Sequence, residues 1–135
     1  MPLDNESLRR VLIVDDNESV GELLTGAVRE MGFEAAHSSG GANALALMAE
    51  RPHGIVITDL QMAPMDGFQL ASKLKRLYPE AVVSFLSGEV NSDVEDYAMQ
   101  LGAFAYLRKP VSKAEIEAVV KRAFRRLCRQ QKAGR

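Results

Sequence analysis

The stretch Val11-Leu12-Ile13-Val14-Asp15-Asp16 decides the fold. Its first four residues are a run of branched apolar side chains, which predicts a buried strand of the kind found in parallel sheets. The run stops at two acidic residues. Ile55-Val56-Ile57-Thr58-Asp59 repeats the pattern, again with an acid at its end. We therefore expect two buried strands, each followed directly by carboxylates.

Strand-like and helix-like segments alternate along the rest of the chain. Further strands are predicted at Glu34–His37, Val82–Leu86 and Phe104–Leu107. Apolar residues at helical spacing follow each of the five strands, in residues 20–31, 42–49, 70–77, 94–101 and 116–127. Five strand–helix repeats predict an α/β fold with a doubly wound, five-stranded parallel sheet that carries helices on both faces.

Length and composition indicate one ordinary globular domain. The chain has 135 residues, of which 47% are hydrophobic and 26% charged, and this suits a single domain. We expect a short leader at 1–9, the domain at 10–129 and a basic tail at 130–135. No apolar run approaches the roughly 20 residues that cross a bilayer, and Met1–Arg10 lacks the apolar core of a secretory signal. With Cys128 as the single cysteine, a cytoplasmic location is expected.

Charge is unevenly distributed along the chain. The net charge is −1, but residues 121–135 carry seven basic side chains and no acidic one. The remainder is therefore acidic, which argues against a nucleic-acid-binding core and suits a site that gathers a cation. A solvated helix end is the simpler interpretation of the basic stretch, and contact with nucleic acid or an acidic partner stays open.

Polar side chains follow four of the five predicted strands. They are Asp15, Asp16, Asp59, Ser87 and Lys109. In open α/β sheets, ligands bind outside the carboxyl ends of the strands, so we expect these side chains to form one site. Three adjacent carboxylates repel one another unless a hard cation such as Mg²⁺ joins them. A carboxylate nucleophile, a cation, a lysine and a hydroxyl make a complete set for accepting a phosphoryl group.

Each of these residues also has an ordinary explanation when taken alone. Asp15-Asp16 could start a helix, and Asp59 could cap a loop. An isolated Lys109 is most often a surface lysine, and Tyr106 alone is a core aromatic. Asp66-Gly67 is predicted to be a turn and helix cap rather than part of the site. The joint pattern, rather than any single residue, favours the phosphoryl-accepting site.

The two histidines, His37 and His53, are not expected to be catalytic. Neither stands with the acids at the end of a strand, and two isolated histidines make no metal-binding motif.

The pattern resembles the receiver domain of two-component response regulators over nearly the whole chain. The motifs that carry the resemblance are Val14-Asp15-Asp16, Thr58-Asp59, Met62 through Met65-Asp66-Gly67, Leu86-Ser87-Gly88 and Lys109-Pro110. Each motif is common by itself, and all of them in this order at strand ends are specific. The resemblance implies a flavodoxin-like sheet with strand order 2-1-3-4-5.

The resemblance also implies a metal site and a phosphoacceptor. Asp59 would take the phosphoryl group. Asp16 would bind Mg²⁺ directly, and Asp15 would do so directly or through water. Asp59 itself and the backbone carbonyl of Gln61 would complete the protein ligands.

A second group of residues would respond to the phosphoryl group. Lys109 would pair with Asp59 and later with the phosphoryl group, and the Lys109–Pro110 peptide bond would be cis. Ser87 would bind a phosphoryl oxygen, and Tyr106 would be the aromatic residue that turns inward on activation.

The resemblance implies a phosphorelay switch in signal transduction rather than an enzyme. The donor would be a sensor histidine kinase or a phosphotransfer protein. The target would be a downstream protein or output domain that contacts the fourth helix, fifth strand and fifth helix. The receiver itself is expected to bind neither nucleic acid nor membrane. Homodimer formation, and whether the chain acts alone or within a longer regulator, stay open.

Three other functions fit the sequence less well. A receiver that binds partners without phosphorylation would usually lack one of the acids or the lysine, and all are present. A flavin carrier needs a phosphate-binding loop after the first strand, where Asp15-Asp16 would repel phosphate. A Mg²⁺-dependent phosphatase needs a segment that closes over its substrate, and none is evident. Two departures from the receiver pattern, Ala63 ahead of Pro64 and serine at position 87, affect loop shape and rotamer preference rather than chemistry.

Overall fold

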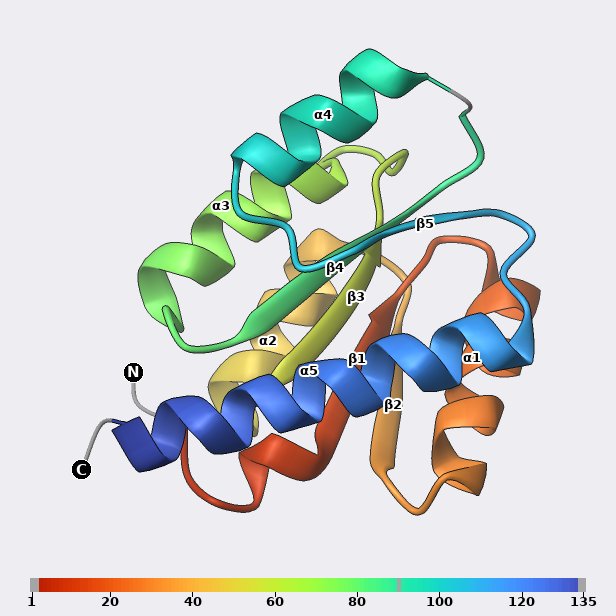
Figure 1. Cartoon of the computed structure of the whole chain (residues 1–135). Coiled ribbons are helices and arrows are strands. Elements are labelled where there is room, and N and C mark those ends of the chain that lie inside the picture. The colour runs from red at the N-terminus through yellow and green to blue at the C-terminus, as the bar shows by residue number, and fades with distance from the viewer. Residues whose placement is uncertain (1–2, 90, 134–135) are drawn as a thin grey trace.

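The computed structural model describes residues 3–89 and 91–133, and strands and helices alternate along it (Figure 1). The strands are β1 (Arg10–Val14), β2 (Glu34–Ser38), β3 (Ile55–Asp59), β4 (Val82–Ser87) and β5 (Tyr106–Arg108). The helices are α1 (Glu18–Glu30), α2 (Gly41–Glu50), α3 (Gly67–Leu77), α4 (Ser92–Gln100) and α5 (Lys113–Ala133), preceded by the short 3-10 helix η1 (Ser7–Arg9). The predicted doubly wound fold is confirmed, because all neighbouring strands pair in parallel in the order β2-β1-β3-β4-β5.

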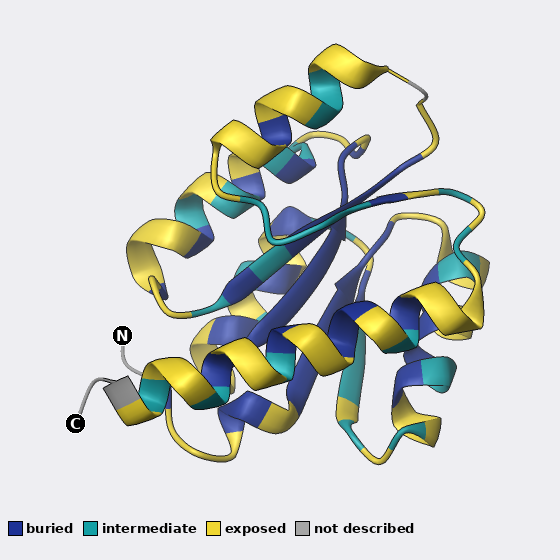
Figure 2. Cartoon of the chain, in the orientation of Figure 1, coloured by how far each residue is buried: buried dark blue, intermediate teal, exposed yellow. Residues whose placement is uncertain are grey.

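Apolar side chains on the two central strands face two different cores. Every residue of β1 and β3 is buried, as the dark central strands of Figure 2 show. Successive side chains of a strand point to opposite faces of the sheet. Val11 and Ile13 therefore pack with α1 and α5, whereas Leu12 and Val14 pack with α2 and α3. This two-sided burial holds the carboxyl ends of β1 and β3 side by side.

The last strand is shorter than its apolar run predicts. We expected Phe104–Leu107, and β5 instead spans Tyr106–Arg108. Phe104 still donates its backbone N–H to Val83 O at 2.8 Å, and Ala105 O accepts from Phe85 N at 3.0 Å. Residues 104 and 105 thus bond to β4 before regular pairing begins.

The two ends of the described chain lie together (Figure 1). Leu3 and Leu8 are buried in the core beneath α5, and Gln131 Nε2 donates to Leu3 O at 3.2 Å. Residues 130–133, predicted as part of a basic tail, continue α5 as helix. The division of the chain into leader, domain and tail stays a prediction. None of the described helices is both long and apolar enough to span a bilayer.

Candidate functional site

Three carboxylates meet where β1 and β3 end. The two strands pair in register, with Val14 opposite Thr58, so the residues that follow them emerge at one edge of the sheet. One carboxylate oxygen from each of Asp15, Asp16 and Asp59 lies within 4.8 Å of the other two. Asp15 and Asp59 are buried and Asp16 is exposed. The cluster therefore has a buried floor and a side open to solvent.

Lys109 reaches this cluster from the end of β5. Its backbone N–H donates to Ser87 O at 2.8 Å, which ties the loop after β5 to the end of β4. Its Nζ atom lies 2.9 Å from Asp15 Oδ2 and 3.2 Å from Asp59 Oδ2. One ammonium group thus bridges the two buried carboxylates.

Backbone amides hold the other oxygen of each buried carboxylate. Asp15 Oδ1 accepts from Asn17 N at 2.9 Å, and Asp59 Oδ1 accepts from Gln61 N at 3.3 Å. Asp15 Oδ2 accepts no well-aligned hydrogen bond within the part of the chain that the structure describes, although it faces the Lys109 ammonium. Each carboxylate is therefore fixed through one oxygen and presents the other to a cation.

Burial and the contacts between Lys109 and the carboxylates shift the pKa values of Asp59 and Lys109 in opposite directions. Burial raises the pKa of Asp59 above its usual value, and this outweighs the lowering by the Lys109 hydrogen bond and charge. For Lys109, burial lowers the pKa, but the hydrogen bonds and charges of Asp15 and Asp59 outweigh it and leave the pKa raised. Lys109 stays positively charged at neutral pH and is positioned to stabilise negative charge.

Ser87 is the last residue of β4, and Tyr106 is the first residue of β5. Ser87 is fully buried, and its Oγ accepts from Glu89 N at 3.1 Å. Tyr106 pairs with Phe85 in the sheet and packs against the small core around Phe85 and Ala98. Its hydroxyl is buried and has no hydrogen-bond partner among residues 3–89 and 91–133. The ring is therefore directed inward in this structure.

Two peptide bonds before proline are cis within the described residues, Ala63–Pro64 and Lys109–Pro110. The first lies in the loop after β3, and the second follows the lysine of the site. Gln61, from the same β3 loop, supplies its backbone N–H to Asp59.

Gly67, which the sequence predicts only to be a turn residue, lies against the site. Gly67 donates its backbone N–H to Leu60 O at 2.9 Å, and an added Cβ would collide with the Asp59 carbonyl oxygen. Asp66 and Gln69 form the predicted cap, with a reciprocal capping box at the start of α3. The Asp-Gly pair signals a turn, but sequence gives no sign of this close approach to β3.

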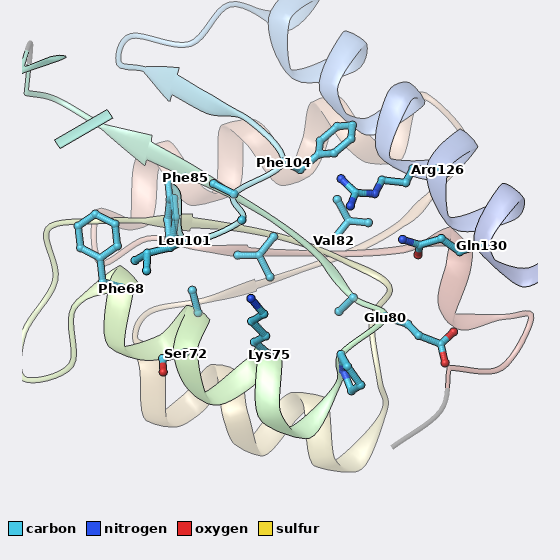
Figure 3. Close-up of a pocket in the computed structure, with 16 residues that line it drawn as sticks. Phe68, Ser72, Lys75, Glu80, Val82, Phe85, Leu101, Phe104, Arg126 and Gln130 are labelled. Atoms are coloured by element: carbon cyan, nitrogen blue, oxygen red, sulfur yellow. The ribbon is translucent and has the colours of Figure 1, made fainter. Parts of the chain in front are cut away.

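A cavity of about 330 Å³ lies away from the carboxylates. It borders α3 and the first half of β4 and is lined partly by Phe68, Lys75, Phe104 and Arg126 (Figure 3). None of the predicted site residues lines it. The carboxylate cluster, not this cavity, is therefore the candidate functional site.

Residues 11–121 match the family model of the response regulator receiver domain. The chain belongs to this family. Receiver domains are phosphoacceptor modules of two-component signalling rather than catalytic enzymes, and the acidic pocket of Asp15, Asp16 and Asp59 with Lys109 is the arrangement that this function requires.

Known relatives agree with this assignment. The chain is 33% identical over 119 residues to an NtrX-like response regulator of Rickettsia bellii, covering 87% of this chain and 25% of that protein. The chain thus spans about a quarter of the length of that relative. A receiver domain from Clostridium thermocellum has a TM-score of 0.81 at 28% identity, covering 87% of this chain and 94% of that one. The receiver domain of NtrX from Brucella abortus has a TM-score of 0.80 at 28% identity, covering 85% and 98%.

The donor set of the cluster fits a hard divalent cation. Carboxylate oxygens are the ligands that Mg²⁺ prefers, together with carbonyl oxygens and water. The three carboxylates supply such oxygens within 4.8 Å, and exposed Asp16 leaves room for water. The acidic cluster is typical of a magnesium site in receivers.

Proposed function

We propose that Asp59 accepts a phosphoryl group from a phosphohistidine of a sensor histidine kinase or phosphotransfer protein. The single observation that carries this assignment is the Asp59 carboxylate, buried at a strand end between two other carboxylates and 3.2 Å from the Lys109 ammonium. Such a group is held in place by its neighbours and faces the groups that neutralise incoming phosphate.

The proposed step is a displacement at phosphorus. A carboxylate oxygen of Asp59 forms a bond to phosphorus, and the bond between phosphorus and the donor imidazole nitrogen breaks. The released imidazole takes up a proton from water, and Asp59 becomes an acyl phosphate. One hydrogen bond of the Lys109 ammonium passes from the Asp59 carboxylate to a phosphoryl oxygen. The lysine therefore balances the negative charge of the transferring group throughout the step.

The metal ligands in this proposal are Asp15, Asp16, Asp59 and the backbone carbonyl of Gln61. When bound, Mg²⁺ would neutralise charge on the carboxylates and on the phosphoryl oxygens. Asp59 keeps Oδ1 on the backbone N–H of Gln61, which holds the plane of the carboxylate, and its Oδ2, which accepts from Lys109, is the oxygen proposed to react. Asp15 keeps one oxygen on the Asn17 amide in the same way.

Ser87 and Tyr106 form the proposed switch. The Ser87 hydroxyl now accepts from Glu89 N, and turning it to a phosphoryl oxygen would move it away from that amide. The inward Tyr106 ring packs against Phe85 and Ala98, so a change at Ser87 reaches α4 through this ring. A partner that contacts α4, β5 and α5 would sense the change. We place this exchange in the cytoplasm, where histidine kinases present their phosphohistidine.

Intact mass after incubation with Mg²⁺ and acetyl phosphate tests the proposal. The wild-type chain should gain the mass of one phosphoryl group, and Asp59→Asn should gain none. The exposed Asp96→Asn variant is the matched control and should behave as the wild type. A gain that persists in Asp59→Asn would refute the acceptor, and no gain in the wild type with any donor would refute the function.

A further inference from the structure

A histidine from outside the acidic cluster holds the backbone of that cluster. The His37 ring on β2 places Nε2 2.8 Å from the backbone carbonyl oxygen of Asp15. A carbonyl only accepts hydrogen bonds, so the ring nitrogen donates and carries the proton. Ser38, the next residue of β2, accepts from Asp15 N at 3.0 Å. The end of β2 thus binds both backbone groups of Asp15.

The His37 side chain takes the place of a missing backbone donor. β1 and β2 pair up to Val14 and Ser38, and after Ser38 the chain turns into α2. No further backbone N–H of β2 continues the ladder to the Asp15 carbonyl. A buried carbonyl without a partner would be costly, and the imidazole supplies that partner.

A glycine on α1 makes room for this ring. An added Cβ at Gly21 would collide with His37 and would stand 2.6 Å from its Cε1 atom. On the same helix, an added Cβ at Gly26 would meet nothing within 4 Å. Glycine in a helix interior lowers stability relative to alanine. The absence of a side chain at position 21 is therefore needed to accommodate the His37 ring, whereas position 26 has no such steric requirement.

We propose that His37 is a positioning residue for the metal site, supported by Gly21. This inference rests on the proposed function, in which Asp15 and Asp16 bind Mg²⁺. The Asp15 carbonyl belongs to the peptide unit that joins these two residues, and a peptide unit is planar. Fixing the Asp15 carbonyl oxygen therefore fixes the orientation of the whole peptide unit, and with it the position from which Asp16 extends. His37 acts on the ligands through the backbone, as outer partners orient the ligands in metal sites.

Two pairs of variants separate the hydrogen bond from simple packing. His37→Gln places an amide nitrogen at the same bond count from Cα as Nε2 and keeps a donor. His37→Met has similar size and no donor. Gly21→Ala displaces the ring while leaving His37 in the sequence, and Gly26→Ala on the same helix is its control.

The primary measurement is the Mg²⁺ dissociation constant by titration calorimetry, with folding of each variant checked by circular dichroism. Loss of an outer partner typically weakens metal affinity about 10-fold or more. We expect that loss in His37→Met and Gly21→Ala, and values within about twofold of wild type in His37→Gln and Gly26→Ala.

Specific results would overturn the inference. Wild-type affinity in His37→Met would show that the hydrogen bond does not position the ligands, and an equal loss in His37→Gln would indicate ring packing instead. Imidazole nitrogen NMR of the metal-free protein should show the Nε2-protonated form of His37, and the opposite tautomer would remove the basis of the proposal. Absence of Mg²⁺ binding in the wild type would instead defeat the proposed function, and this inference with it.

Discussion

Gly67 and Asp59 touch through their backbones, at the point where α3 begins and β3 ends. An added Cβ at position 67 would stand 2.8 Å from Leu60 Cα and would overlap the Asp59 carbonyl oxygen. The Gly67 N–H donates to Leu60 O at 2.9 Å. The start of α3 therefore supports the strand end that carries the proposed phosphoacceptor.

Gly67→Ala should destabilise the protein although alanine favours helices. Overlap with a rigid backbone typically costs about 1–3 kcal/mol of unfolding free energy, which exceeds the gain of about 1 kcal/mol in helix propensity. Gly26→Ala meets nothing within 4 Å and should raise stability by about 0.5–1 kcal/mol. Urea unfolding of both variants checks the pair, and a Gly67→Ala protein as stable as Gly26→Ala would contradict the contact.

Lys109→Met should lower the stability of the metal-free protein at pH 7. The lysine side chain is 23% exposed and bridges two buried carboxylates, and breaking such a pair costs about 3 kcal/mol. Burial already raises the pKa of Asp59, and loss of the ammonium should raise it further. A carboxyl group with a raised native pKa stabilises the fold below its unfolded pKa of about 4 and loses that effect as the pH rises.

The Lys109→Met defect should therefore shrink between pH 7 and pH 4, and added Mg²⁺ should reduce it at pH 7. Melting temperatures with and without Mg²⁺ across this range check both expectations. A defect that is constant with pH would mean that lost packing, rather than unpaired charge, is responsible. Lys73→Met, which removes a lysine from α3, is the control.

His53 should contribute to a loss of stability on acidification. Burial lowers the pKa of His53, and the charges of Arg10 and Arg51 act in the same direction, against its hydrogen bond to Arg51 O. A depressed native pKa gives stability that is present above the unfolded pKa of about 6.5 and is lost as the pH falls through the native value.

Proton NMR titration of the two histidine rings measures this directly. The His53 resonance should titrate below pH 6.5, and His37→Gln assigns it by removing the other signal. A normal His53 titration would show that the ring is hydrated in solution.

Tyr106→Phe should stabilise the protein by about 1 kcal/mol, because a buried hydroxyl without a partner carries a desolvation penalty. The Tyr106 hydroxyl is buried and has no hydrogen-bond partner among the described residues. Tyr97 is 51% exposed, so Tyr97→Phe should be neutral and serves as the control. Chemical unfolding measures both, and a destabilised Tyr106→Phe would mean that the hydroxyl finds a partner in solution.

Much of the fold follows from the sequence because the central strands are buried on both faces. An uninterrupted run such as residues 11–14 has few alternatives to a parallel strand, and the alternation with helices then limits the topology. The edge strand was harder to predict. Apolar residues at 104 and 105 suggested regular strand there, whereas only backbone geometry shows that regular pairing starts at Tyr106.

The acids and lysine of the site were predictable because each stands directly after a strand. Parallel strands end at one edge, so their following residues meet there, and Lys109 lies within reach of Asp59. The supporting residues were not predictable in the same way. His37 and Gly67 act through contacts with backbone atoms of distant segments, and such contacts leave no local pattern of spacing or charge.

The hydrogen bond between Gln131 and Leu3 brings the two ends of the described chain together. This determines which side of the molecule faces outward when it is immobilised on a surface near those ends. The backbone carbonyl oxygen of Ser7, four residues after Leu3, accepts from Gly54 N at 2.7 Å, and Gly54 lies just before β3 begins. Both ends of the described chain therefore leave from the edge of the sheet where the strands start, while the carboxylates lie where they finish. A molecule immobilised through a residue near either end of the described residues would face its acidic site away from the support, which suits surface-based binding measurements.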